Sequence, residues 1–333
     1  MKAWLTVIIP IILGTIAISF NNVVRRYVMK SRAISPLQGL ILYYAAAAGL
    51  FGVVYIFFWG LTLPQLLPGI WTAVICGVAV NIFIQFFKMK ASSLDEGEVS
   101  LTAPLQALTP GLIIGLALLL GEYPSKVGVL GIGLMVLGTY VLLWEKTPQH
   151  WYEYFGPLKR IIGLFRKDLT LAERNKNLAV MLSLGSAGLG TIGLIFDGLY
   201  SRRSINIQGL IFSAGVFVGL LCLIYLAWYL LRSATQPAQR FRSISRRAIF
   251  GLLAMGVLWV MQVVTIYPTF AKTFIAYTGT LKRFSILISV VLGYFLFHEQ
   301  DIKKRLWAAI IILAGVILIS LDDLPARLSA YFR

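Results

Sequence analysis

Two adjacent basic residues, Lys282 and Arg283, interrupt an otherwise apolar stretch that runs from 277 to 299 and reads YTGTLKRFSILISVVLGYFLFHE. The stretch has the composition of a membrane-spanning helix that begins near 274. Lys282 then lies roughly 12 Å inside the span, close to the middle of a hydrocarbon core about 30 Å thick. A Lys or Arg there costs about 2.5 to 3.5 kcal/mol on insertion scales, so we expect a cavity, a partner or a ligand to compensate the pair.

The chemistry of this pair favours an anionic ligand. Arg offers a two-pronged fork that matches phosphate or carboxylate, whereas Lys acts as a point charge. Adjacent helical residues point about 100° apart, so we expect one of the two to face a cavity while the other braces a neighbouring helix. A purely structural pairing with an acidic residue is the alternative interpretation.

Other polar residues within apolar stretches are candidates for the same site. For binding the substrate they are Asn21, Asn81, Gln85, Gln106, Gln262 and Tyr277. For charge pairing or coupling they are Asp197, Glu122 and Glu299. Interhelical hydrogen bonds would explain each amide equally well. Asp197 could instead cap the end of its span, and the two Glu residues could be interfacial.

Composition identifies the chain as an integral membrane protein. Of its 333 residues 59% are hydrophobic and 13% are charged, and the mean hydropathy is +0.83. Apolar runs of about 20 residues predict ten spans, at 4–22, 37–59, 69–88, 100–120, 126–144, 178–200, 207–231, 248–268, 274–297 and 304–321.

Lys and Arg outnumber Asp and Glu by 30 to 13, which is typical of cytoplasmic loops beside anionic lipids and makes nucleic acid the weaker interpretation. Two isolated cysteines and two distant histidines give no support to a disulfide framework, a metal site or a cofactor.

The two sets of five spans resemble each other. GTIAISFNN at 14–22 matches GTIGLIFDG at 190–198, which aligns Asn21 with Asp197. An offset of 177 aligns Gln85 with Gln262, Glu122 with Glu299, and Gly138 with Gly315. Because five is odd, the second set must enter the membrane from the opposite side. We therefore predict two inverted five-helix repeats, at 1–144 and 178–333, joined by an amphipathic basic linker at 145–177 that lies on the membrane surface.

Two passages resemble the drug/metabolite transporter superfamily in its ten-span EamA-like branch: APLQALTPGLIIGLALLLGEYPSKVGVLGIGLMVLGTYVLL at 103–143 and LKRFSILISVVLGYFLFHEQDIKKRLWAAIIILAGVILI at 281–319. The resemblance implies an all-helical inverted repeat, a central cavity, secondary transport without ATP, and a place in the inner membrane of a bacterium. The adjacent Lys282 and Arg283 are also similar to the pair with which triose-phosphate and nucleotide-sugar translocators hold phosphate. Similar Leu-Lys-Arg runs in EamA-like proteins leave the substrate open.

The sequence thus favours a secondary transporter of a small polar anion, for instance a phosphorylated metabolite, acting as a monomer or homodimer among membrane lipids. A flippase for an anionic lipid headgroup such as polyprenyl phosphate, and an amino-acid exporter, are the alternatives. Enzymatic chemistry on phosphates would need clustered carboxylates, and Asp197 is the clearest acid within the spans. The distribution of Lys and Arg favours both termini outside the cytoplasm, whereas the resemblance implies that both lie inside.

Overall fold

The protein is a helical membrane protein. The computed structural model describes residues 2–31, 34–64, 70–109, 112, 125–143, 170–201, 207–233, 245–270, 282–299 and 301–322, and each regular element within these ranges is a helix. The elements are α1 (Lys2–Lys30), α2 (Pro36–Trp59), α3 (Ile70–Ser93), α4 (Val99–Leu105), the 3₁₀ turn η1 (Gln106–Leu108), α6 (Lys126–Leu143), α8 (Leu171–Ser201), α9 (Ile207–Ser233), α10 (Arg246–Phe270), α12 (Ser285–Phe297) and α13 (Ile302–Asp322).

Four segments among the described residues are long and apolar enough to cross a membrane: Ile8–Lys30, Pro36–Trp59, Ile75–Ser93 and Arg246–Ile266. Shorter apolar helices cover Lys126–Leu142, Ile211–Tyr225 and Ser285–Phe297. Large apolar side chains such as Phe57, Val53 and Phe250 point out of the bundle. Lipid tails solvate such side chains without the penalty that water imposes. The helical membrane class predicted from composition is therefore confirmed.

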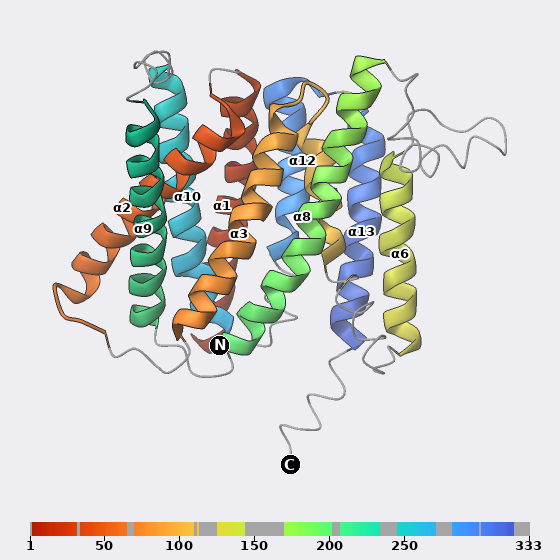
Figure 1. Ribbon diagram of the computed structural model, residues 1–333. Coiled ribbons are helices and arrows are strands. Elements are labelled where there is room, and N and C mark those ends of the chain that lie inside the picture. The colour runs from red at the N-terminus through yellow and green to blue at the C-terminus, as the bar shows by residue number, and fades with distance from the viewer. Residues whose placement is uncertain are drawn as a thin grey trace, which may run out of the picture.

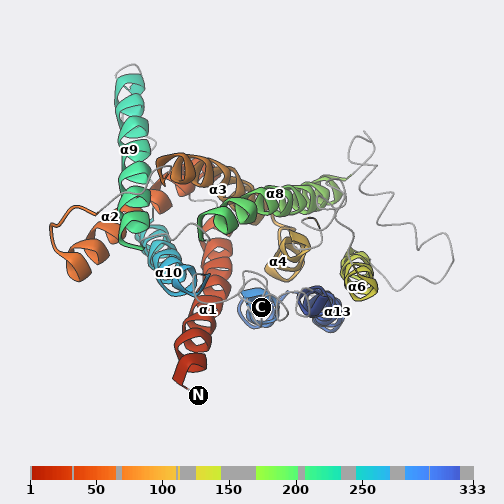
Figure 2. The ribbon, with the colours of Figure 1, turned by 90° about the horizontal axis from the view of Figure 1, so that it is seen from below.

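The helices stand side by side in a bundle that extends from α2 and α9 at one end to α6 and α13 at the other (Figures 1 and 2). Helices from the two halves of the chain pack in pairs: α1 with α10, α3 with α8, α2 with α9, α4 with α12, and α6 with α13. The middle of the bundle is thus formed by helices of both halves.

Two glycines allow α6 and α13 to pack closely. A Cβ atom at Gly138 would lie 2.7 Å from Ile312 Cγ1 and 2.9 Å from the Ala308 carbonyl oxygen. A Cβ atom at Gly315 would lie 2.7 Å from Met135 Cγ and 2.5 Å from the carbonyl oxygen of Gly131. The two sets of contacts are equivalent in the repeat, because the offset of 177 aligns residues 131, 135 and 138 with residues 308, 312 and 315.

Two helices are interrupted beside each other in the middle of the bundle. At Gln106, two residues after Pro104, α4 gives way to the 3₁₀ turn η1, as the proline there leads one to expect. In the second half, Phe284 forms a turn between the helical residues Lys282 and Arg283 and the start of α12 at Ser285. The span expected at 274–297 therefore has a one-residue turn at Phe284, whose φ of −58° and ψ of −18° stay in the right-handed helical region, at a position that the offset of 177 matches to η1.

Three helices extend beyond the limits of the predicted spans. α1 continues to Lys30 and α3 to Ser93, beyond the predicted ends at 22 and 88, and α8 already begins at Leu171, inside the predicted linker. Hydropathy ends a span at its first charged residues, but Arg25 and Arg26 find hydrogen-bond acceptors within the protein, so the helix continues through them. The rest of the linker, 145–169, lies outside the described residues.

Candidate anion-binding cavity

A cavity of about 170 Å³ lies where α1, α3, α8 and α10 meet the interrupted helices α4–η1 and α12. By volume it has room for on the order of ten water molecules, which suits a small metabolite. Seven of the eight predicted substrate-binding residues line it: Asn21, Asn81, Gln85, Gln106, Gln262, Lys282 and Arg283. The eighth, Tyr277, lies outside the described residues. Residues scattered over five predicted spans are thus brought to one place.

Four basic side chains line this cavity: Arg25 of α1, Lys88 of α3, and the pair Lys282 and Arg283. None of the described residues that line it is acidic. On insertion scales four such groups would cost roughly 10 to 14 kcal/mol in a hydrocarbon environment. The cavity is therefore suited to an anion, whose charge would offset part of this penalty.

The Arg283 side chain reaches across to the interruption in the first half of the chain. Its Nη1 donates a hydrogen bond to the backbone carbonyl of Gln106 at 3.1 Å, the residue that the offset of 177 aligns with Arg283 itself. Its buried Nε has no hydrogen-bond partner among the described residues. The guanidinium is held in place on one side and retains donors for a ligand on the other.

Arg25 is held by three amide side chains. Its Nη2 donates to Asn21 Oδ1 at 2.9 Å and to Gln85 Oε1 at 3.1 Å, and its Nη1 donates to Asn22 Oδ1 at 3.1 Å. Asn21 also donates to the backbone carbonyl of Met255 at 3.2 Å, which ties the cluster to α10. The amide oxygens accept from both terminal nitrogens, while the buried Nε has no hydrogen-bond partner among the described residues. Amide oxygens carry no charge, so these contacts leave the positive charge of Arg25 uncompensated.

The sequence reasoning missed Arg25 and Lys88 because it assigned both to positions beyond or at the end of a span. A signal for them was present. Arg25 lies four residues after Asn21, and Lys88 three residues after Gln85, so each shares a helical face with a predicted site residue.

An aromatic wall closes one side of the cavity. Tyr43 and Trp259 line it, with ring centroids 5.8 Å apart. The Trp259 ring also packs against Phe51 at 5.2 Å. Phe51 in turn borders a separate, apolar groove of about 400 Å³ between α2 and α9. The contact between Trp259 and Phe51 therefore makes the polar cavity and the apolar groove neighbours.

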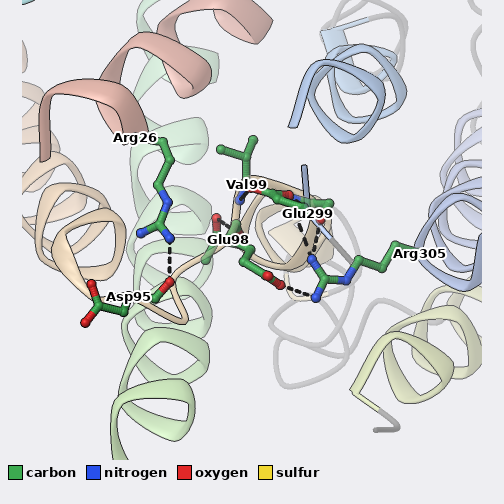
Figure 3. A network of polar contacts seen from close by, with 8 residues as sticks. Arg26, Asp95, Glu98, Val99, Glu299 and Arg305 are labelled. Atoms are coloured by element: carbon green, nitrogen blue, oxygen red, sulfur yellow. Dashed lines mark hydrogen bonds and ion pairs between the residues drawn. The ribbon is translucent and has the colours of Figure 1, made fainter. Parts of the chain in front are cut away.

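Glu299 lies outside the cavity lining and caps the start of α4. The carboxylate accepts hydrogen bonds from the backbone amides of Val99 at 2.7 Å and Ser100 at 2.8 Å, and from Ser100 Oγ. Arg305 of α13 extends between Glu98 and Glu299, donates to Ser100 Oγ and forms ion pairs with both carboxylates (Figure 3). The first turn of α4 is thus fixed to the end of α12 and the start of α13.

The backbone around Glu299 is shaped to turn its carboxylate back over α12. His298 adopts the left-handed conformation at φ 52° and ends the helix. A Cβ atom at Gly293 would lie 2.7 Å from Glu299 Oε2, so the carboxylate occupies space that only glycine leaves open. Nearby, Arg26 donates to the carbonyls of Ser92, Leu94 and Asp95 and so holds the turn that leads into α4 (Figure 3).

The two other predicted charge-pairing residues cannot be placed relative to the cavity. Glu122 lies outside the described residues, and for Asp197 the structure describes its position in α8 but not its side chain.

Comparison with known proteins supports the fold alone. No protein-family model and no curated protein matches this sequence. A protein whose crystal structure has been solved superposes on 96% of this chain and 98% of its own chain, with a TM-score of 0.52 at 15% sequence identity. The arrangement of helices therefore occurs in an experimentally determined protein, while the likeness carries no information on the substrate.

Proposed function

We propose that the protein is a secondary transporter that moves a small polar anion, such as a phosphorylated metabolite, across a bacterial inner membrane by alternating access. The observation that carries this proposal is the cavity in the middle of the bundle, which four basic and no acidic side chains line among the described residues. Intramembrane charges that face a common cavity are a mark of substrate or ion pathways.

The proposal includes the architecture of ten spans in two inverted repeats, as in the EamA-like branch. The pairing of helices supports it. If a two-fold axis relates the first five spans to the second five, the contact of α1 with α10 is equivalent to that of α8 with α3. The contacts α2–α9, α4–α12 and α6–α13 then each join an element to its own equivalent.

The reciprocal glycine contacts of α6 and α13 support the same axis. So do the interruptions at Gln106 and Phe284, which face each other through the hydrogen bond from Arg283 to the Gln106 carbonyl. Transporters with inverted repeats commonly bind their substrate at such broken helices, near the midplane.

The test begins with the purified protein and measures the shift in melting temperature with phosphorylated metabolites, dicarboxylates, amino acids and lipid phosphates. We expect polyvalent anions to stabilise the protein, because they bind the folded state alone. The stabilising anion is then loaded into proteoliposomes, and its transport is compared for the wild type and Arg283→Gln.

Arg283→Gln should reduce transport by at least tenfold, since a hydrogen bond to a charged group contributes about 1.5 to 3 kcal/mol. Arg247→Gln is the matched control, because Arg247 is exposed at the start of α10 and lies outside the cavity lining. Transport by Arg283→Gln at the wild-type rate would contradict the proposal, as would the absence of stabilisation by any anion.

The apolar groove between α2 and α9 favours one alternative, a flippase for an anionic lipid headgroup. Trp259 lines the cavity and contacts Phe51, which lines the groove, so a headgroup in the cavity and an acyl chain in the groove would be adjacent. Soluble anions distinguish the two functions. A flippase moves fluorescent polyprenyl phosphate between leaflets, whereas the proposed transporter carries the soluble anion and leaves the lipid in place.

A further inference from the structure

Among the basic side chains that line the cavity, Lys88 has the fewest polar contacts with described residues. It borders both the main cavity and a small void of about 10 Å³ beside it, which is large enough for one water molecule. Within the part of the chain that the structure describes, Lys88 has neither a hydrogen bond nor an ion pair. The charges of Arg25, Lys282 and Arg283 all act on it repulsively. Among the described residues, Lys88 thus lacks the partner that a charge within a membrane normally has.

Lys88 and Arg283 approach the cavity from different halves of the chain. Lys88 lies near the end of α3, and Arg283 lies at the interruption before α12. The offset of 177 pairs Lys88 with Thr265 and Arg283 with Gln106, so neither charge is duplicated by the repeat. An anion between them would be bound by both halves at once.

Arg25 differs from Lys88 in that its position is fixed. Its two terminal nitrogens are already bound to amides of Asn21, Asn22 and Gln85, and its side chain is 4% exposed. Its buried Nε has no hydrogen-bond partner among the described residues, but both terminal nitrogens are held, so Arg25 contributes chiefly a fixed positive charge beside Lys88. Its role is therefore to position these amides and to raise the electrostatic potential of the cavity.

We propose that Lys88 is a direct ligand of the transported anion, and that Lys88, Arg25, Lys282 and Arg283 together select a solute with at least two negative charges on one compact group, such as a phosphate monoester. The inference rests on the proposed function and deepens it. A monoanion would offset one of four positive charges, whereas a phosphate monoester carries about two and presents three acceptor oxygens. Three oxygens allow simultaneous contact with Lys88 on α3 and with Arg283 before α12.

The test uses two probes of similar size, methyl phosphate and dimethyl phosphate. At pH 8 the monoester is a dianion, because its second ionisation lies near pH 6, while the diester carries one negative charge. Binding of each probe to the purified full-length protein is measured by calorimetry. The variants are Lys88→Gln, Lys88→Arg and Arg283→Gln, with Lys90→Gln as the control that removes a charge from the same helix outside the cavity lining.

The wild type should bind methyl phosphate at least tenfold more tightly than dimethyl phosphate. Lys88→Gln should weaken methyl phosphate binding by roughly ten- to hundredfold and reduce the preference for the dianion, whereas Lys88→Arg should retain most of the affinity. Lys90→Gln should bind as the wild type does. If a lysolipid phosphate displaces methyl phosphate, the proposed selection of a dianion stands, and the dianion is the headgroup of a lipid.

The outcomes separate this inference from the proposed function. If Arg283→Gln loses binding while Lys88→Gln retains wild-type affinity and preference, the role of Lys88 is wrong and the anion site stands. If Arg283→Gln also binds as the wild type does, the proposed site itself fails. Equal binding of the two probes by the wild type, or binding of neither, would overturn the selection of a dianion.

Discussion

Replacing Glu299 with Gln should destabilise the folded protein, because it removes a buried carboxylate that connects α4, α12 and α13. Glu299 is 5% exposed. It accepts two backbone hydrogen bonds and one hydroxyl hydrogen bond at the start of α4 and lies 3.8 Å from Arg305 Nη1. Gln keeps the shape of the side chain but presents one oxygen instead of two.

The magnitude follows from these contacts. If the Gln oxygen accepts from Val99, its amide group faces the donors of Ser100, and a buried donor without an acceptor costs about 1 to 3 kcal/mol. Breaking a buried ion pair costs about 3 to 5 kcal/mol, but Arg305 keeps its pair with Glu98. We therefore expect Glu299→Gln to lower the free energy of unfolding by about 3 kcal/mol.

Equilibrium unfolding of the purified protein by SDS in mixed micelles measures this change. Glu173→Gln is the control, because Glu173 accepts the Thr170 amide at 2.9 Å in a comparable helix cap but is exposed; it should change stability by about 1 kcal/mol at most. The double variant with Arg305→Gln tests the coupling, which should be about 0.5 to 3 kcal/mol for residues in one network. A loss below about 1 kcal/mol for Glu299→Gln, or strict additivity with Arg305→Gln, would refute the reasoning.

Two further predictions concern packing and capping. Gly138→Ala and Gly315→Ala should each destabilise the protein by about 1 to 3 kcal/mol, since the added methyl groups meet α13 and α6 at under 3.0 Å. The control is Gly133→Ala, on α6 with Gly138, because the space around a Cβ atom at Gly133 is open. It should leave stability unchanged or raise it in the same unfolding assay. Equal effects of all three substitutions would contradict the reciprocal contacts. Ser35→Ala removes a capping box, in which Ser35 and Gln38 each accept a hydrogen bond from the other's backbone amide. This substitution should lower the melting temperature by an amount that corresponds to about 1 kcal/mol.

Much of the architecture follows from hydropathy alone. Long apolar runs identified the helical membrane class, because a chain in lipid must satisfy its backbone groups within helices. The interruption of the span at 274–297 was not predicted, since no proline stands in the second half at the positions that match Pro104 and Pro110. The structure places a turn at Phe284, next to the Arg283 side chain that donates to the Gln106 carbonyl. Such a contact between residues 177 positions apart has no local sequence signal.

The buried carboxylate Glu299 was predicted as a pairing residue but without its partners. The hydrogen-bond donors to its carboxylate lie about 200 residues away at Val99 and Ser100, and its ion-pair partner Arg305 lies across a turn. The repeat places Glu299 opposite Glu122, which suggests a common structural role, yet sequence spacing cannot tell which helix start a carboxylate caps. That information came from the left-handed turn at His298 and the open space at Gly293.

Of the residues that line the cavity, hydropathy and polarity predict the amides within the spans but miss two basic residues near the span ends. Polar residues deep within apolar runs do converge on one cavity, because a polar group in lipid needs an interior partner. Hydropathy, however, ends a predicted span at its first charged residues, and so it left Arg25 and Lys88 out of the predicted site. Helical spacing nevertheless puts Arg25 on the face of Asn21 and Lys88 on the face of Gln85. A charge that continues the polar face of a span belongs to the interior when neighbouring amides can hold it, as Asn21, Asn22 and Gln85 hold Arg25. Lys88 also continues the polar face of its helix, and it lines the cavity although no amide among the described residues holds it, so its substitution tests whether a ligand takes the place of those amides.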